Sequence, residues 1–157
     1  MTTVISPSKP TGLLKLVFAL PRYLYRWHLG WLLGNRFLML THIGRKTGRR
    51  RQTVLEIVHY DPSTRERIVM AGYGAQSDWY RNIQAQPAID VQVGRQHFTP
   101  QQRMLSEEET LALLTWYQEH HPLVFRKLMN LMGYAYDGTP EGLHALSKVL
   151  QGVALRP

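Results

Sequence analysis

The chain contains no cysteine. This absence excludes disulfides, thiolate metal sites, iron–sulfur clusters and cysteine nucleophiles. The seven histidines, at positions 28, 42, 59, 97, 120, 121 and 144, form neither a His-x-x-x-His nor a His-Glu-x-x-His pattern. Because zinc-type sites depend on such spacings, we expect no protein metal site.

Several catalytic motifs are missing as well. The sequence has no Gly-x-Ser-x-Gly elbow, no Walker lysine loop and no convincing pair of acidic residues, so hydrolase and phosphotransfer chemistry lack their parts. It also lacks a βαβ repeat and the Gly-x-Gly-x-x-Gly fingerprint, which argues against a Rossmann fold. The chemistry must therefore come largely from a bound molecule.

No apolar run is long enough to span a membrane. The most apolar stretch, Leu13–Leu33, is interrupted by Lys15, Pro21, Arg22 and Arg26, whereas a span needs ~20 consecutive apolar residues. A signal peptide is also excluded, because the basic residues lie inside the apolar stretch and no small-residue cleavage site follows. We expect a cytoplasmic protein.

The same stretch has a helical pattern with its basic residues on one narrow stripe. It predicts a short helix and a second one that starts at Pro21, packed on the rest of the protein. A basic stripe flanked by Trp27 and Trp31 also suits a helix that lies in a membrane interface. Peripheral membrane contact through residues 13–33 stays open as the alternative.

Size and charge set the remaining limits. A length of 157 residues with 44% hydrophobic content is enough for one compact domain, residues 1–157. Nineteen Lys and Arg against eleven Asp and Glu give a net charge of +8, which attracts anions. Nucleic acid, acidic lipid and a phosphorylated or polycarboxylate cofactor are the three candidate partners.

Strand patterns predominate in the middle of the chain. Alternating and β-branched segments predict strands at Arg36–Ile43, Gln52–Tyr60, Arg67–Gly72, Ala88–Val93 and Gln96–Leu105. The turn residues Asp61–Thr64 make the second and third of these a hairpin. Residues 36–105 therefore predict a small, mainly antiparallel barrel.

Helices are expected between and after these strands. Ser77 begins one that runs to Ala85, and Ser106 with Glu109 forms a capping box at the start of another. Prolines at first helical positions predict further helices over 122–132 and 139–150. The fold class is therefore α+β, with an N-terminal helical segment (1–33) and C-terminal helices (106–150) packed around the barrel.

The most informative segment is the turn Gly44–Arg51. It holds five cations in seven positions, together with two glycines that allow positive φ and bring backbone N–H groups close to a ligand. Arginine forks suit phosphate and carboxylate oxygens, so the turn predicts an anion site. Two alternatives are a solvated basic hairpin tip and a nucleic-acid contact, although no recognisable nucleic-acid module surrounds it.

A second segment, Ala71–Ala75, follows a strand and consists mostly of small residues. Such a strand end lets a flat ring lie against the backbone, where free N–H groups can bond ring carbonyl oxygens. Glycines also end strands for purely structural reasons. Trp79 and Tyr80, shortly after it, are expected to be core and wall residues rather than catalysts.

Together, these segments resemble the deazaflavin-dependent nitroreductase family, within the split β-barrel flavin-binding superfamily. The residues that carry the resemblance are Leu38–Gly48, Arg51, Thr53, Ala71–Gly74, Asp78–Ile83, Pro87 and Val91–Gly94. The match runs from about Arg36 to Ser106. The combination of Gly-Arg-Lys-Thr-Gly with a downstream Trp-Tyr-x-Asn is much more specific than either motif alone.

The resemblance implies a split β-barrel that binds reduced coenzyme F420 and passes a hydride to a quinone, nitroaromatic or enone. The implied contacts of the phosphate and oligoglutamate tail are Arg45, Lys46, Thr47, Gly48, Arg49, Arg51 and Thr53. The implied contacts of the deazaflavin ring are Gly72, Tyr73, Gly74, Ala75 and Trp79. FMN is the alternative cofactor, and a homodimer is a further expectation.

Two kinds of alternative function remain at this point. One is a flavin-, haem- or lipid-binding protein of the same fold that performs no reduction, and the other is a basic nucleic-acid-binding module. If a hydride carrier is bound, the protein orients it and excludes water. Tyr73, Tyr134 and Tyr136 are then candidate catalytic proton donors, with Tyr134 and Tyr136 expected in the acceptor pocket.

Overall fold

The computed structural model describes residues 35–72 and 74–157. The expected helices over 13–33, their membrane contact and the candidate residue Tyr73 lie outside the described residues. Within the described ranges, no helix combines the length and the apolar character needed to cross a membrane.

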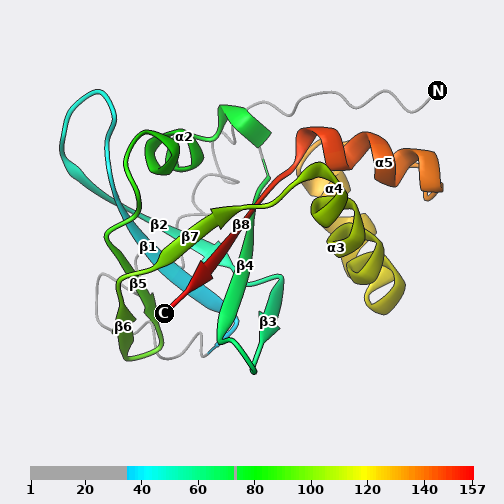
Figure 1. The fold of residues 1–157 in the computed structure, drawn as a ribbon. Helices are drawn as coiled ribbons and strands as arrows, with labels where there is room; N and C mark the ends of the chain where they lie inside the picture. The colour runs from blue at the N-terminus through cyan, green and yellow to red at the C-terminus, as the bar shows by residue number, and fades with distance from the viewer. Residues whose placement is uncertain (1–34, 73) are drawn as a thin grey trace.

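In residues 35–72 and 74–157, eight strands form two four-stranded antiparallel sheets (Figure 1). The first sheet has the order β2-β1-β5-β6, with β1 at Phe37–Ile43, β2 at Arg50–Glu56, β5 at Asp90–Val93 and β6 at Gln96–Phe98. The second has the order β3-β4-β8-β7, with β3 at His59–Asp61, β4 at Glu66–Ala71, β7 at Gln101–Met104 and β8 at Gln151–Arg156. The predicted α+β class with an antiparallel barrel is confirmed.

The expected strand Gln52–Tyr60 is in fact two strands in different sheets. Ile57 still donates its backbone N–H to Arg36 beside the first sheet, whereas Val58 donates to Ile68 in the second. The chain therefore changes sheets between two adjacent residues. Hydrophobic patterning alone does not reveal this change, because the residues on both sides are apolar and partly buried.

The expected strand Gln96–Leu105 is divided in the same way. It contributes β6 to the first sheet and β7 to the second, with Thr99 and Pro100 between them. Proline has no N–H to donate to a sheet, so the strand ends there. Each of these two segments, predicted as a single strand, therefore connects the two sheets of the barrel.

The helices agree with the sequence patterns. Their bounds are α2 Asp78–Ala85, α3 Glu107–His120, α4 Pro122–Leu131 and α5 Pro140–Val149, with a 3₁₀ turn, η2, at Gly74–Gln76. The capping box of Ser106 and Glu109 is present, and the Thr139 side chain accepts a hydrogen bond from the Gly142 N–H. α3, α4 and α5 gather at the right of the view beside the second sheet, while α2 lies above the strands at the upper left (Figure 1).

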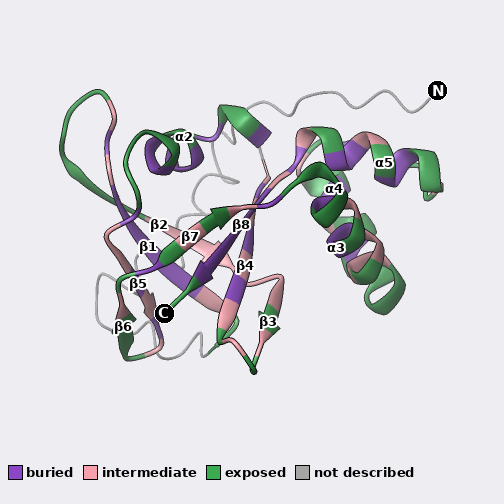
Figure 2. Cartoon of the chain, in the orientation of Figure 1, coloured by how far each residue is buried: buried purple, intermediate pink, exposed green. Residues whose placement is uncertain are grey.

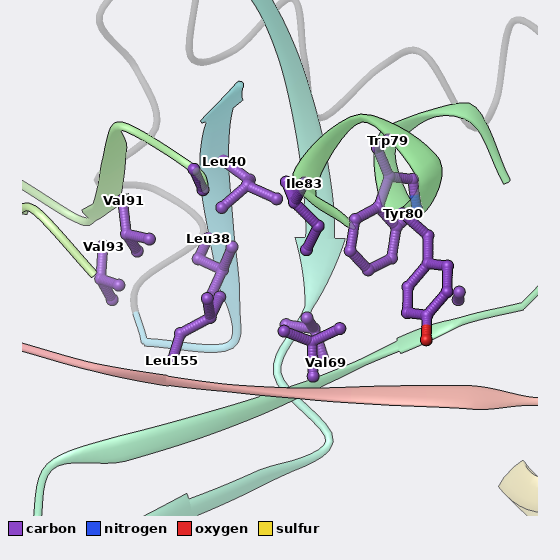
Figure 3. Close-up of a cluster of buried hydrophobic side chains, with 12 residues drawn as sticks. Leu38, Leu40, Val69, Trp79, Tyr80, Ile83, Val91, Val93 and Leu155 are labelled. Carbon is purple, nitrogen blue, oxygen red and sulfur yellow. The ribbon is translucent and has the colours of Figure 1, made fainter. Parts of the chain in front are cut away.

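Buried residues run along β1, β4 and β8 at the centre of the barrel (Figure 2). In this core, Leu38 and Leu40 from β1 meet Val91 from β5 and Leu155 from β8, and α2 adds Trp79, Tyr80 and Ile83 (Figure 3). A second cluster, around Phe125, Met129 and Leu146, joins the C-terminal helices. The boundary between these two clusters is where the candidate site lies.

Candidate functional site

The turn between β1 and β2 is closed by its own backbone. Gly44 donates its N–H to the Arg49 carbonyl at 2.9 Å, and Gly48 donates to the Gly44 carbonyl at 2.8 Å. Gly48 has a φ of 67°, a conformation that favours glycine. A Cβ added at Gly44 would lie 2.7 Å from the Thr47 hydroxyl oxygen, so a side chain there would force the Thr47 side chain to move.

A polar cavity of about 590 Å³ lies beside this turn; we call it the basic basin. Of the predicted tail contacts, those that line it are Arg45, Lys46, Thr47, Arg51 and Thr53, whereas Gly48 and Arg49 do not. Arg50 adds a further cation to the lining. The structure thus brings most of the predicted anion-binding residues into one cavity.

Arg45 joins the turn to helix α2. Its backbone N–H and guanidinium both donate to the Asn82 side-chain oxygen, at 3.1 and 2.9 Å, and its guanidinium also pairs with Asp78 at 3.2 Å. The Arg45 side chain is only 19% exposed, whereas that of Asp78 is 62% exposed. Arg45 is therefore part of the wall of the basin, whereas Lys46, Arg50 and Arg51 are exposed cations.

His42 lies buried behind the basin. Its Nδ1 is 3.1 Å from the Asn82 side-chain nitrogen, and its Nε2 is 3.1 Å from the Thr53 hydroxyl. Burial, and secondly the positive charge of Arg51, lower the pKa of His42 to about 4. The imidazole is therefore neutral at pH 7, and the positive charge of Arg51 favours that state.

An apolar cavity of about 620 Å³ adjoins the basin. It lies between β2, β4 and the C-terminal helices, and its walls include Met70, Leu114, Phe125, Met129 and Met132. Among the described residues, those that line both cavities are Thr53, Asp78 and Trp79. The two cavities therefore meet at one junction, polar on one side and apolar on the other.

Gly72 and Trp79 are the predicted ring contacts that line the apolar cavity, whereas Gly74 and Ala75 lie in the adjacent 3₁₀ turn and do not line it. A Cβ added at Gly72 would overlap the Met132 methyl group, so a side chain at this position would require the end of the Met132 side chain to move. Trp79 is also 91% buried in the barrel core, as its residue type predicted.

The two C-terminal tyrosines lie behind the helical wall, and neither lines the apolar cavity. The Tyr134 hydroxyl donates to the Gly72 carbonyl at 2.5 Å. The Tyr136 ring packs edge-on against Phe125, and its buried hydroxyl has no hydrogen-bond partner in the described part of the chain. Burial raises the pKa of Tyr136 above its ordinary value.

Sequence reasoning missed His42, Gln52 and Asn82 as residues of this site. All three line the basin, but they are uncharged and lie on a strand or a helix beside the basic turn. One signal was available. His42 and Thr53 lie on paired strands on either side of the turn, where a β1–β2 hairpin would bring them close.

Comparison with known proteins supports the fold and the family. The model of the family described as F420H(2)-dependent quinone reductase matches residues 28–126. A solved F420-H2 dependent reductase (FDR-A) is 18% identical with a TM-score of 0.52, and 78% of this chain covers 96% of that one. A structure described as a domain-swapped dimer is 17% identical with a TM-score of 0.52, and 87% of this chain covers 99% of it.

At these identities the solved structures establish the fold alone, and they confirm the predicted split β-barrel. A search of curated proteins finds no significant match.

Proposed function

Because the chain belongs to the F420H2-dependent quinone reductase family, we propose that its basic basin and apolar cavity hold the two ends of one cofactor molecule. The family makes the protein a deazaflavin-dependent oxidoreductase with coenzyme F420 as its cofactor, as its motifs predicted. The phosphate and oligoglutamate tail lies in the basin. The deazaflavin ring lies at the junction and extends into the apolar cavity.

The observation that carries this proposal is the junction itself. Thr53, Asp78 and Trp79 line both cavities, so a molecule with an anionic tail and a flat ring fits them without a break. The donor set also fits the tail, because Lys46, Arg50 and Arg51 are exposed cations on the basin. Asp78 is the acidic residue among the described lining of the basin, and its charge is paired with Arg45.

The bound cofactor supplies the hydride. The chain supplies position and environment: the turn 44–51 holds the tail, and Gly72 presents no side chain at the wall where the ring lies. Apolar residues from β4 and the helices exclude water from the place where the acceptor lies. Orientation and water exclusion are what a hydride-transfer site requires of its protein.

We further propose that the acceptor is a small organic molecule, a quinone, nitroaromatic or enone, and that it binds in the apolar cavity. Ligand pockets commonly measure about 300–1,000 Å³ and are mostly apolar with few polar groups. The cavity of about 620 Å³, walled by Met129, Met132 and Phe125, fits that description. Lipophilic, planar acceptors match such walls better than charged ones do.

The roles of the tyrosines follow from their positions. Tyr134 holds the Gly72 backbone at the cavity wall. We therefore propose that it positions the part of the wall that faces the cofactor ring, rather than donating a proton to the acceptor. Tyr136 is enclosed with Phe125 and has a packing role. Tyr73 stays a predicted proton donor.

The test is a fluorescence titration of the purified protein with F420 and with FMN. Lys46→Ala with Arg50→Ala removes two basin cations that have no described structural partner, and is expected to weaken F420 binding by at least about tenfold, because charge-assisted contacts are lost. The matched control, Lys127→Ala with Lys148→Ala, removes the same charge from exposed sites outside both cavities.

The proposal is supported if the wild type binds F420, the basin variant binds it more weakly and the control variant binds it as the wild type does. Absence of F420 binding, or an equal loss in the control, would contradict it. Turnover of quinone, nitroaromatic and enone acceptors by the F420-loaded wild type then identifies the acceptor class.

A further inference from the structure

We propose that His42 is a positioning residue, which occupies one lone pair of the Thr53 hydroxyl and so keeps the hydroxyl hydrogen free to donate to an unprotonated oxygen of the ligand. Thr53 lies at the junction of the two cavities, and His42, which is 2% exposed, lies beside it in the lining of the basin. The inference rests on the proposed function, since the ligand oxygen belongs to the bound cofactor. It adds a role for a buried uncharged residue beside the cationic turn.

The first step is the orientation of the Asn82 amide. The Asn82 side-chain oxygen receives two donors from Arg45, the backbone N–H at 3.1 Å and the guanidinium at 2.9 Å. Both groups only donate, so the atom that faces them must be the oxygen. The opposite orientation would leave donors facing donors around a residue that is only 3% exposed, which is costly. The amide nitrogen therefore faces His42.

The second step is the tautomer of His42. The Asn82 amide nitrogen, 3.1 Å from Nδ1, is a donor and cannot accept a hydrogen bond. Nδ1 must therefore carry no proton, which places the proton of the neutral imidazole on Nε2. An imidazolium would direct a second N–H at the Asn82 amide, and the buried position beside Arg51 opposes that charge as well.

The third step concerns Thr53. Nε2–H lies 3.1 Å from the Thr53 hydroxyl oxygen, so that oxygen accepts from His42. In the described part of the chain, the Thr53 hydroxyl hydrogen has no acceptor. Its hydrogen is therefore free to donate toward the ligand, while one of the two lone pairs of its oxygen is already occupied by His42. Phosphate, carboxylate or ring carbonyl oxygens satisfy this hydrogen, whereas a ligand donor would have only the second lone pair to use.

One consequence is an additional uncharged donor on a basin that already holds several cations. The exposed cations donate along the turn, and Thr53 donates at the junction. His42 favours this donor without adding another charge. A threonine alone donates one hydrogen and accepts through two lone pairs, and the imidazole on one of those lone pairs shifts the balance toward an oxygen acceptor in the ligand.

The first experiment examines the protein without ligand. Long-range ¹⁵N–¹H correlation NMR at pH 7 distinguishes a protonated from an unprotonated imidazole nitrogen, and a His42→Gln variant identifies the His42 signals among the seven histidines. We expect an unprotonated Nδ1 and a protonated Nε2. An Nδ1–H tautomer, or an imidazolium at pH 7, would overturn the proposal whatever the protein binds.

The second experiment is a double-mutant cycle on F420 affinity, measured by fluorescence titration. Thr53→Val is expected to weaken binding about tenfold, the scale of one hydrogen bond to a charged group. His42→Phe should weaken it by a similar factor, and the two substitutions together no more than Thr53→Val alone. Thr53→Ser, which restores the hydroxyl, should recover most of the affinity that valine loses.

The outcomes separate the two proposals. Losses that multiply to about a hundredfold in the double variant would mean that His42 acts independently of Thr53, and the positioning role would fall. A wild-type protein that binds no F420 would overturn the proposed function and, with it, the ligand that Thr53 meets. Circular dichroism of each variant confirms that it is folded, and the NMR experiment on the wild type does not depend on any variant used for binding.

Discussion

The Tyr134 hydroxyl donates a hydrogen bond to the Gly72 carbonyl at 2.5 Å, across 62 positions of sequence. Gly72 follows β4 and lines the apolar cavity, whereas Tyr134 follows α4. The Met132 side chain lies against the same glycine. The segment after α4 therefore holds the edge of the cavity at a single backbone position.

Tyr134→Phe is expected to lower the free energy of unfolding by about 1–3 kcal/mol, because it leaves the Gly72 carbonyl without its partner. The effect on turnover should be several-fold, since the phenylalanine ring still fills the space. Chemical denaturation and steady-state kinetics measure the two quantities. A fall in turnover of a hundredfold or more at unchanged stability would instead make Tyr134 a proton donor.

Gly72→Ala tests whether the missing side chain makes room. The new methyl group meets the flexible end of the Met132 side chain, which can move aside, so the loss of stability should not exceed about 1 kcal/mol. Adding Met132→Ala removes the overlap and should recover part of the stability but not the cofactor affinity, because the methyl group still stands at the ring face. Urea denaturation with an F420 titration tests both, and full recovery of affinity would place the ring elsewhere.

The sequence predicted the basic turn and the helices well because their signals are local. Gly48 needs its positive φ, and the Ser106–Glu109 capping box depends on residues three positions apart. His42 and Asn82 carried no such signal. Their role depends on a contact across 40 positions, between β1 and α2, that only the folded chain creates.

The strand β8 was missed for a different reason. No strand was predicted after Leu150, yet β8 lies between β4 and β7 in the second sheet. Four consecutive residues of it, Gly152–Leu155, are buried, so no alternation of polar and apolar residues reveals a strand. It is a strand because it pairs with β4 and β7, which are both distant from it in sequence.

Ending the chain at Leu150 tests the importance of β8. The deletion leaves the backbone groups of β4 and β7 without their partner and removes Val153 and Leu155 from the barrel core. We expect a chain that does not fold, measured by circular dichroism and solubility. A control that ends at Leu155 loses only exposed residues and should stay folded. A cooperative thermal transition in the shorter chain would contradict the central role of β8.

The lowered pKa of His42 predicts a dependence of stability on pH. The folded protein holds this pKa at about 4, against 6.5 for an unperturbed histidine, so between these values the unfolded chain binds the proton more readily. The contribution of His42 to the free energy of unfolding is therefore complete above pH 6.5 and is lost as the pH drops toward 4. At about 1.4 kcal/mol per pKa unit, the loss is on the order of 3 kcal/mol. Urea denaturation between pH 7 and 4 measures this loss. His42→Gln is the reference, because this contribution is absent there. If the free energy of unfolding depended on pH in the same way in both proteins, His42 would not be held neutral by the fold.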